Sequence, residues 1–278
     1  ISMLANNNEA IINKLAKNSV KTNKKQYAIL FFTIILSAFM LFCVFTIGMT
    51  YLNSSRLQNT RLNGAEYDIV TMNGFTSEQL NTLQQNENIR SVGIESYAGF
   101  IQSTEYDKTV EIGLLWCDEV FWDNLMSPAR TKLDGHYPQN KNELMVTKDI
   151  LKTCGNENLS VGDSLILTYE NNTGVYTDEF VISGIWDGYG DTSAGFVSKA
   201  FYDETGYDLK NNGILCIKLN CNYVFPTTIQ SIEKSLDFSD RQIFAPTGYI
   251  ENSFKLLLGI CGLALVICLS AYLLIYNI

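Results

Sequence analysis

Two long runs without a charged residue dominate the hydrophobic pattern of the chain. The first extends from Tyr27 to Tyr51, and the second extends from Leu256 to Ile278. A helix needs about 20 apolar residues to cross the hydrocarbon core of a bilayer, so each run is long enough to predict a transmembrane helix. The alternative for the first run, a cleaved signal peptide, has an apolar region of only about 7–15 residues, and this run is longer.

A basic amphipathic helix is predicted ahead of the first run. Between Asn8 and Thr22 the apolar residues recur at helical spacing, and lysines take the other side. Five lysines precede the run, against one acidic residue, Glu9. Because Lys and Arg accumulate on the cytoplasmic side, the pattern predicts a cytoplasmic segment at 1–26 and a span at 27–51 that leads outward. Residues 52–253 would then be extracytoplasmic, and 254–278 would return through the membrane.

The end of the second run leads to a further expectation. No Lys or Arg follows it, although spans are usually anchored by positive charge on the cytoplasmic face. We therefore expect the chain to be the N-terminal portion of a longer polytopic protein with additional spans.

The extracytoplasmic segment begins and ends with the same order of elements. Its first part predicts a strand at 65–72, a short helix after Thr76, and strands within 89–103 and 109–116; Gln79 stands at capping-box spacing from Thr76. Its last part predicts a strand at 212–220, a helix at 225–237 and a strand at 240–246. We expect these two β-α-β units, within 52–108 and 211–253, to pair in one membrane-proximal lobe.

The middle of the segment, 109–210, reads as an inserted lobe rich in strands. Strands are predicted at 161–169 and 179–186, and the turn sequence NNTG at 171–174 joins them. Short helices are expected near 118–126 and after the strand that ends near 197. The predicted fold class is an α+β membrane protein in which two transmembrane helices flank a two-lobed domain.

Charge and cysteine content narrow the range of functions. Residues 53–253 hold 14 Lys and Arg against 28 Asp and Glu, a net charge of −14. Such a surface should repel nucleic acid and anionic lipid headgroups. Two interpretations stay open: the acidic surface favours cationic ligands, or its charge only keeps the domain soluble. Of the seven cysteines, three fall in the spans. A bridge between Cys216 and Cys221 stays open as an alternative to free thiols, but no zinc-binding spacing is present.

No catalytic or cofactor site is predicted. The chain lacks GxSxG, HExxH and Walker-type phosphate-binding motifs, and its one histidine, His136, cannot form a His-rich metal site. The acidic residues Asp118, Glu119 and Asp123 lack the spacing of a calcium loop and are expected on a solvated helix face. The glycine-rich segment 187–195 is expected to be a flexible surface loop, a type of segment that often meets a partner or substrate.

His136 lies in the phrase LDGHYPQNKNELMVT, with carboxylates nearby at Asp134, Glu143 and Asp149. Gly135 and Pro138 are turn formers, and Glu143 leads an apolar strand. Since His136 has no second histidine, nucleophile or metal partner in the sequence, we assign it to a turn that enters a strand. Replacing it with alanine is expected to leave function largely intact.

The order of these sequence segments resembles that in the extracytoplasmic core domain of MacB-like and FtsX-like ABC transporter permeases. The resemblance is carried by the Gly135–Pro138 turn, by Glu143 before its strand, by Val161, Gly162 and Asp163 before the next strand, and by the apolar strand at 181–185. In that family an arginine often stands at the position of His136. The resemblance covers nearly the whole chain, although the later spans of such a permease are absent from it.

This resemblance implies a non-enzymatic permease subunit that works with a separate cytoplasmic ATPase and a second permease copy or paralogue. ATP-driven motion would reach the extracytoplasmic domain through stalks near 52–62 and 247–253 and act on a peptide, an antibiotic, a lipid-linked molecule or a partner protein. Two alternatives stay open at this point. One is a two-span receptor, and the other is an FtsX-like activator of cell-wall hydrolases.

Overall fold

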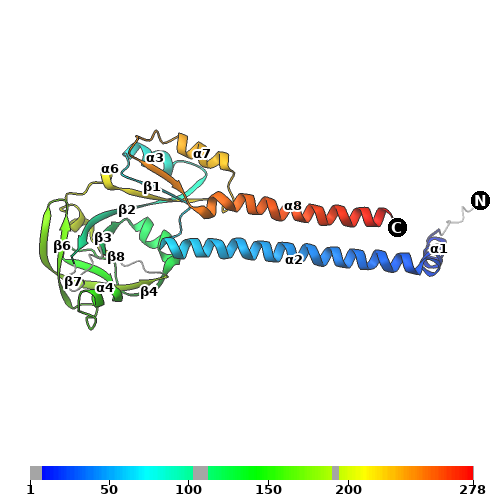
Figure 1. Ribbon diagram of the computed structural model, residues 1–278, viewed down its shortest axis with the longest axis horizontal. Helices are drawn as coiled ribbons and strands as arrows, with labels where there is room; N and C mark the ends of the chain where they lie inside the picture. The colour runs from blue at the N-terminus through cyan, green and yellow to red at the C-terminus, as the bar shows by residue number, and fades with distance from the viewer. Residues whose placement is uncertain (1–7, 103–111, 190–193, 278) are drawn as a thin grey trace, which may run out of the picture. The chain divides into compact units, whose positions relative to one another are not determined.

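The structure is a computed structural model that describes residues 8–102, 112–189 and 194–277 (Figure 1). The chain divides into two compact units. One is helical and comprises Ile1–Leu52 and Lys255–Ile278, and the other is a folded domain, Asn53–Phe254.

Two of the three long helices have the length and composition of membrane spans. After α1 (Asn8–Thr22) comes α2 (Lys24–Asn63), and the chain closes with α8 (Gly248–Tyr276). Both α2 and α8 contain an apolar window that is almost entirely unburied by protein, which matches the predicted spans. Both helices are longer than predicted, because their ends continue into the segments that the sequence suggested as stalks.

A glycine shapes the contact between α2 and α8 in the helical unit. A Cβ atom added at Gly48 of α2 would lie 2.6 Å from Cδ1 of Ile260 in α8. Small residues let helix backbones approach closely in membranes, where lipid offers no hydrophobic driving force. Gly48 thus provides the notch that Ile260 fills.

The described residues of the folded domain form one mixed sheet of ten strands, in the order β10-β1-β9-β2-β3-β8-β5-β7-β4, with β6 beside β2 and β7. The strands are β1 (Ile69–Met72), β2 (Ile89–Ile101), β3 (Ile112–Cys117), β4 (Arg130–Gly135), β5 (Glu143–Thr147), β6 (Ser164–Asn171), β7 (Gly174–Gly188), β8 (Ala194–Val197), β9 (Ile214–Leu219) and β10 (Ile243–Pro246). The short helices are α3 (Ser77–Gln84), the π-helix η1 (Val120–Leu125), the 3₁₀ turn η2 (Ser127–Ala129), α4 (Lys148–Thr153), α5 (Lys199–Tyr202), α6 (Leu209–Asn212) and α7 (Pro226–Lys234).

Strand pairing divides the sheet into two regions that share β2. The first half of β2 pairs with β9, and β9 continues to β1 and β10. The second half pairs with β3 and β6, and the succession β2-β3-β8-β5-β7-β6 returns to β2, so these six strands form a closed ring. A ring leaves fewer free strand edges than an open sheet does.

Each region has its own core. Apolar side chains from the ring strands and from α4 and α5 form one cluster, with Phe180, Leu114 and Leu144 almost fully buried. The other cluster lies between the β1-β9-β2 region and α3 and α7, with Leu83, Ile217 and Ile232 at its centre. In Figure 1 α3 and α7 lie on the same side of β1. The two predicted β-α-β units thus share a core, whereas the lobe boundaries at 108 and 211 stay a prediction.

Three local predictions need correction. The two strands expected within 89–103 are one strand, β2, with an irregularity between Tyr97 and Gly99. Strand β4 was not predicted, because its residues are mostly exposed and carry no apolar alternation. The helix expected near 118–126 is a π-helix; it presses on Gly93 of β2, where an added Cβ would lie 2.9 Å from Cα of Phe121.

Candidate functional site

A buried lysine stands at the centre of one polar cluster of the domain. Lys218 lies on β9 and is only 4% exposed. Its Nζ atom lies 3.2 Å from Oε1 of Glu66 and 3.2 Å from Oδ2 of Asp68. An unpaired buried ammonium would cost several kcal/mol, so these carboxylates are what allow a lysine inside the sheet. We call Arg56, Glu66, Asp68 and Lys218 the basal charge cluster.

Asp68 is the most buried acid of this cluster, at 1% exposure. Its Oδ2 atom accepts a hydrogen bond of 2.9 Å from the backbone N–H of Leu219, and its backbone binds both neighbouring segments: its N–H donates to Ile217 O, and its carbonyl accepts from Thr247 N–H. Burial raises the pKa of Asp68, and the Lys218 ammonium and the Leu219 N–H offset only part of that effect. Asp68 therefore fixes β9 to the residue that precedes α8.

The cluster also reaches the domain ends of both long helices. Arg56, on the last turns of α2, has its guanidinium 4.0 Å from Glu66 Oε1. Tyr249, on the first turn of α8, is buried, and its phenol interacts electrostatically with Arg56, Asp68 and Glu66. Burial first, and then the neighbouring Tyr223 and the two carboxylates, raise the pKa of Tyr249 to about 12 despite Arg56. The charges thus join the end of α2 to β9, and the backbone carbonyl of Asp68 joins them to Thr247, the residue that precedes α8.

A cavity of about 350 Å³ opens beside the cluster, with Glu66 and Lys218 in its wall. The backbone N–H of Glu66 also donates to Leu125 O at the end of η1, at 2.6 Å. The segment before β1 is therefore held between η1 and β9. Sequence reasoning missed this site, because its only signals were a single lysine in an apolar strand and an aspartate before a strand.

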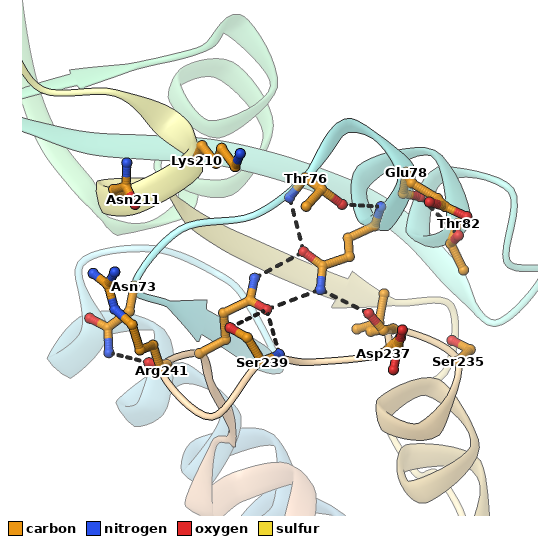
Figure 2. A pocket seen from close by; sticks show the side chains of 13 residues that line it. Asn73, Thr76, Glu78, Thr82, Lys210, Asn211, Ser235, Asp237, Ser239 and Arg241 are labelled. Atoms are coloured by element: carbon orange, nitrogen blue, oxygen red, sulfur yellow. Dashed lines mark hydrogen bonds between the residues drawn. The ribbon is translucent and has the colours of Figure 1, made fainter.

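A second polar site, shown in Figure 2, joins the two β-α-β units. Its centre is a reciprocal pair of amides: Gln79 Nε2 donates to Gln242 Oε1 at 3.2 Å, and Gln242 Nε2 donates to Gln79 Oε1 at 2.9 Å. The same amides donate to the carbonyl groups of Leu236 and Gly74, each at 2.8 Å. A cavity of about 410 Å³ lies over this pair, with Glu78, Lys210, Asp237 and Arg241 among its lining residues.

The capping box predicted at Thr76 and Gln79 is confirmed and is part of this second site. The Thr76 N–H donates to Gln79 Oε1 at 2.9 Å, and the Gln79 N–H donates to Thr76 Oγ1 at 3.2 Å. The Gln79 amide is therefore hydrogen-bonded both to Thr76 at the start of α3 and to the distant Gln242, just before β10. Since its polar atoms are used within the protein, this site acts as a structural joint rather than as a reactive centre.

His136 lies on the exposed connection from β4 to β5, which agrees with the predicted turn. Gly135 adopts a φ of +88°, and its position leaves no room for a Cβ, which would collide with the carbonyl oxygen of Ser183. Glu143 holds the connection by accepting hydrogen bonds from Gln139 N–H at 2.7 Å and from Asn140 N–H at 3.1 Å. Partial burial raises the Glu143 pKa, but these bonds outweigh it and lower the pKa overall.

Tyr137 of the same segment bridges two strands, a role that the sequence pattern did not predict. Its hydroxyl accepts from Cys117 N–H at 3.0 Å and lies 3.2 Å from the carbonyl oxygens of Cys117 and Val197, so it bridges β3 and β8. Its ring packs against Trp122 and Phe196.

The acidic residues near 118 have different surroundings from one another. The prediction of a solvated helix face is wrong for Asp118. Its Oδ1 atom accepts hydrogen bonds from the N–H groups of Ile94 and Phe121, at 3.0 and 2.8 Å, so Asp118 joins β2 to the start of η1. Within the described parts of the chain, no group of three His, Cys, Asp or Glu side chains could hold a metal ion.

The structure also bears on two further predictions, the bridge between Cys216 and Cys221 and the glycine-rich loop at 187–195. Cys216 is buried in β9, Cys221 is exposed beyond its end, and both are free thiols. Of the glycine-rich segment 187–195, residues 190–193 lie outside the described residues, while its two ends belong to or adjoin β7 and β8.

Glu95 is a partly buried carboxyl group in the middle of β2. It stands opposite Cys117 of β3 and Ile214 of β9. Burial raises its pKa to about 7. The charge of Glu95 in turn contributes to raising the pKa of the buried thiols of Cys117 and Cys216, after burial itself.

Comparison with known proteins gives matches of structure only. No protein-family model and no curated protein sequence matches the chain. Among solved structures, the periplasmic region of MacB from Actinobacillus actinomycetemcomitans matches with a TM-score of 0.44 and 13% identity, over 70% of this chain and 95% of that one. The extracellular domain of the noncanonic ABC-type transporter YknZ from Gram-positive bacteria matches with a TM-score of 0.40 and 12% identity, over 64% and 98%. A domain of a putative permease protein from Porphyromonas gingivalis matches with a TM-score of 0.40 and 9% identity, over 66% and 89%.

Proposed function

We propose that the chain is the permease subunit of a MacB/FtsX-type ABC transporter. In this role it passes motion from a separate cytoplasmic ATPase to its extracytoplasmic domain, which acts on a peptide, an antibiotic or a lipid-linked substrate. The observation that carries the proposal is the basal charge cluster, because it joins the domain end of α2 to β9 and, through the Asp68 backbone, to the residue that precedes α8. The resemblance seen in the sequence supports the same role.

The form of the two helices suits the transmission of force. Helix α2 runs without a break for 40 residues and α8 for 29. A continuous helix is stiffer than a loop, so a displacement at its membrane end moves its other end. Inside the domain, the buried Lys218 and Asp68 receive that displacement at a point where water does not screen their attraction.

The partners follow from the proposed role. ATP would bind to a separate cytoplasmic ATPase, since the chain has no phosphate-binding motif. The basic helix α1 would lie on the cytoplasmic membrane surface, where the ATPase could contact it, and a second permease copy would complete the transporter. The domain Asn53–Phe254 would face outward.

A coupling experiment tests this proposal. The chain is produced with an affinity tag in its native cells, and we expect a cytoplasmic ABC-type ATPase to co-purify with it and the complex to hydrolyse ATP. Lys218→Met, checked to remain folded by the elution of its complex as a single species in size-exclusion chromatography, should leave the ATPase bound while lowering ATP hydrolysis by the complex. The matched control is Lys141→Met, since Lys141 forms an exposed pair with Glu204. Absence of a co-purifying ATPase would overturn the proposal, and capture of a histidine kinase or of a cell-wall hydrolase instead would support the receptor or the activator.

A further inference from the structure

One phenylalanine of the domain is exposed to solvent, whereas the other phenylalanines described in the domain are buried or partly buried. Phe225, at the start of α7, is 61% exposed and is the one phenylalanine in this exposed class among the described residues between 53 and 254. Its ring centroid lies 4.6 Å from that of Phe254 on α8. Exposing a large apolar ring to water is unfavourable, so the exposure of Phe225 needs an explanation.

The place of Phe254 along the chain fixes the level of both rings. Phe254 is followed by Lys255 and then by the uncharged run that begins at Leu256. A helix rises about 1.5 Å per residue, so Leu256 is only about 3 Å further along α8. Phe254 therefore stands where α8 enters the bilayer, and the ring of Phe225, packed against it, shares that level.

The charge pattern around Phe225 agrees with this placement. The segment from Leu219 to Ile232 contains no Asp, Glu, Lys or Arg, although such residues are frequent over the rest of 53–253. Charged groups are costly near lipid, and aromatic side chains concentrate at the level of the headgroups. Backbone hydrogen bonds hold the segment in place, since Asn220 N–H donates to Asn88 O at 2.8 Å and Thr228 N–H donates to Phe225 O at 2.9 Å.

We propose that the segment 220–225 is a membrane-contacting loop of the domain, with the Phe225 ring inserted among the lipid headgroups beside α8. The partner is the lipid bilayer itself, because the exposed ring is continuous with the membrane-entering end of α8. Such a contact would hold the start of α7 at the membrane surface and restrain the tilt of the domain. The inference requires only that α8 spans a membrane, so it does not depend on the proposed transport function.

Fluorescence quenching in lipid nanodiscs tests the contact. Phe225→Trp is introduced into the full chain, and Ile166→Trp serves as the control because Ile166, on the β6–β7 hairpin, is 67% exposed. The three native tryptophans are buried and provide a background measured with the unmodified chain. We expect lipids brominated near the headgroup to quench the Phe225→Trp signal at least about twofold more than the control, and aqueous acrylamide to quench it less.

Two results would overturn the inference. Equal quenching of both variants by acrylamide, with no effect of brominated lipid, would show that Phe225 faces water. Protection of the Phe225→Trp signal from both quenchers would show that protein, such as a second copy of the chain, covers the ring. Loss of ATPase coupling in the transporter experiment would affect neither reading, since this measurement contains no ATPase.

Discussion

At the scale of single residues, Lys218 holds two carboxylates together inside the domain. Replacing it with methionine keeps most of the apolar stem of the side chain but leaves the buried Asp68 carboxylate without its cation. Breaking a buried ion pair from one side costs about 3–5 kcal/mol. We expect Lys218→Met to lower the free energy of unfolding of the chain in detergent micelles by that amount, measured by chemical denaturation.

The control for this prediction is an exposed ion pair. Lys141 and Glu204 are both more than half exposed, so Lys141→Met should change the free energy of unfolding by no more than about 1 kcal/mol. Equal losses from the two lysine variants would mean that the basal charge cluster contributes nothing beyond a surface pair.

Glu95 gives a residue-scale prediction about pH. Its pKa is raised from 4.5 to about 7 in the folded chain, so the folded state binds a proton more tightly than the unfolded state. Its contribution to stability is therefore fully present below pH 4.5 and is lost as the pH rises through about 7. We expect Glu95→Gln to flatten the fall in unfolding temperature between pH 5 and 8 and to stabilise the chain at pH 8 by about 1–3 kcal/mol. A Glu95→Gln profile parallel to that of the unmodified chain would contradict this.

At the scale of elements, the packing of α2 against α8 is the contact most open to test. Ile260 fills the space that a side chain at Gly48 would need. Gly48→Leu should therefore separate the helices and lower the unfolding temperature in detergent, at a cost of about 1–3 kcal/mol for overpacking. The double variant Gly48→Leu with Ile260→Ala should recover most of the loss. If the second substitution lowers stability further, the two residues do not share one space.

At the scale of the whole molecule, the predicted topology can be checked with thiol chemistry. Ile166 is 67% exposed in the β6–β7 hairpin, so Ile166→Cys in a Cys221→Ser background should be labelled by a membrane-impermeant maleimide in intact cells. In the same background, a cysteine placed in α1 by Asn18→Cys should react only after the membrane is permeabilised. The Cys221→Ser chain without a new cysteine measures the background labelling. Labelling of the α1 position in intact cells would reverse the orientation inferred from the five N-terminal lysines.

The sequence by itself determined the features whose physics is local. The charge-free runs Tyr27–Tyr51 and Leu256–Ile278 are long enough to cross a bilayer whatever surrounds them. The first lies within α2, and the second lies in α8 as far as Tyr276. The Thr76–Gln79 capping box and the NNTG hairpin turn depend on neighbours close by in the chain, and both appear as predicted.

Only the tertiary structure decided which distant side chains meet. Lys218 and Asp68 are 150 residues apart in sequence, and Gln79 and Gln242 are 163 apart, so no local pattern marks either pair. Strand β4 and the closed ring were likewise not visible, because an exposed strand has no apolar alternation and ring closure depends on pairing partners rather than on periodicity. The basal charge cluster exists because folding buries a lysine and brings two carboxylates to it, and the free energy of that burial is a property of the assembled sheet.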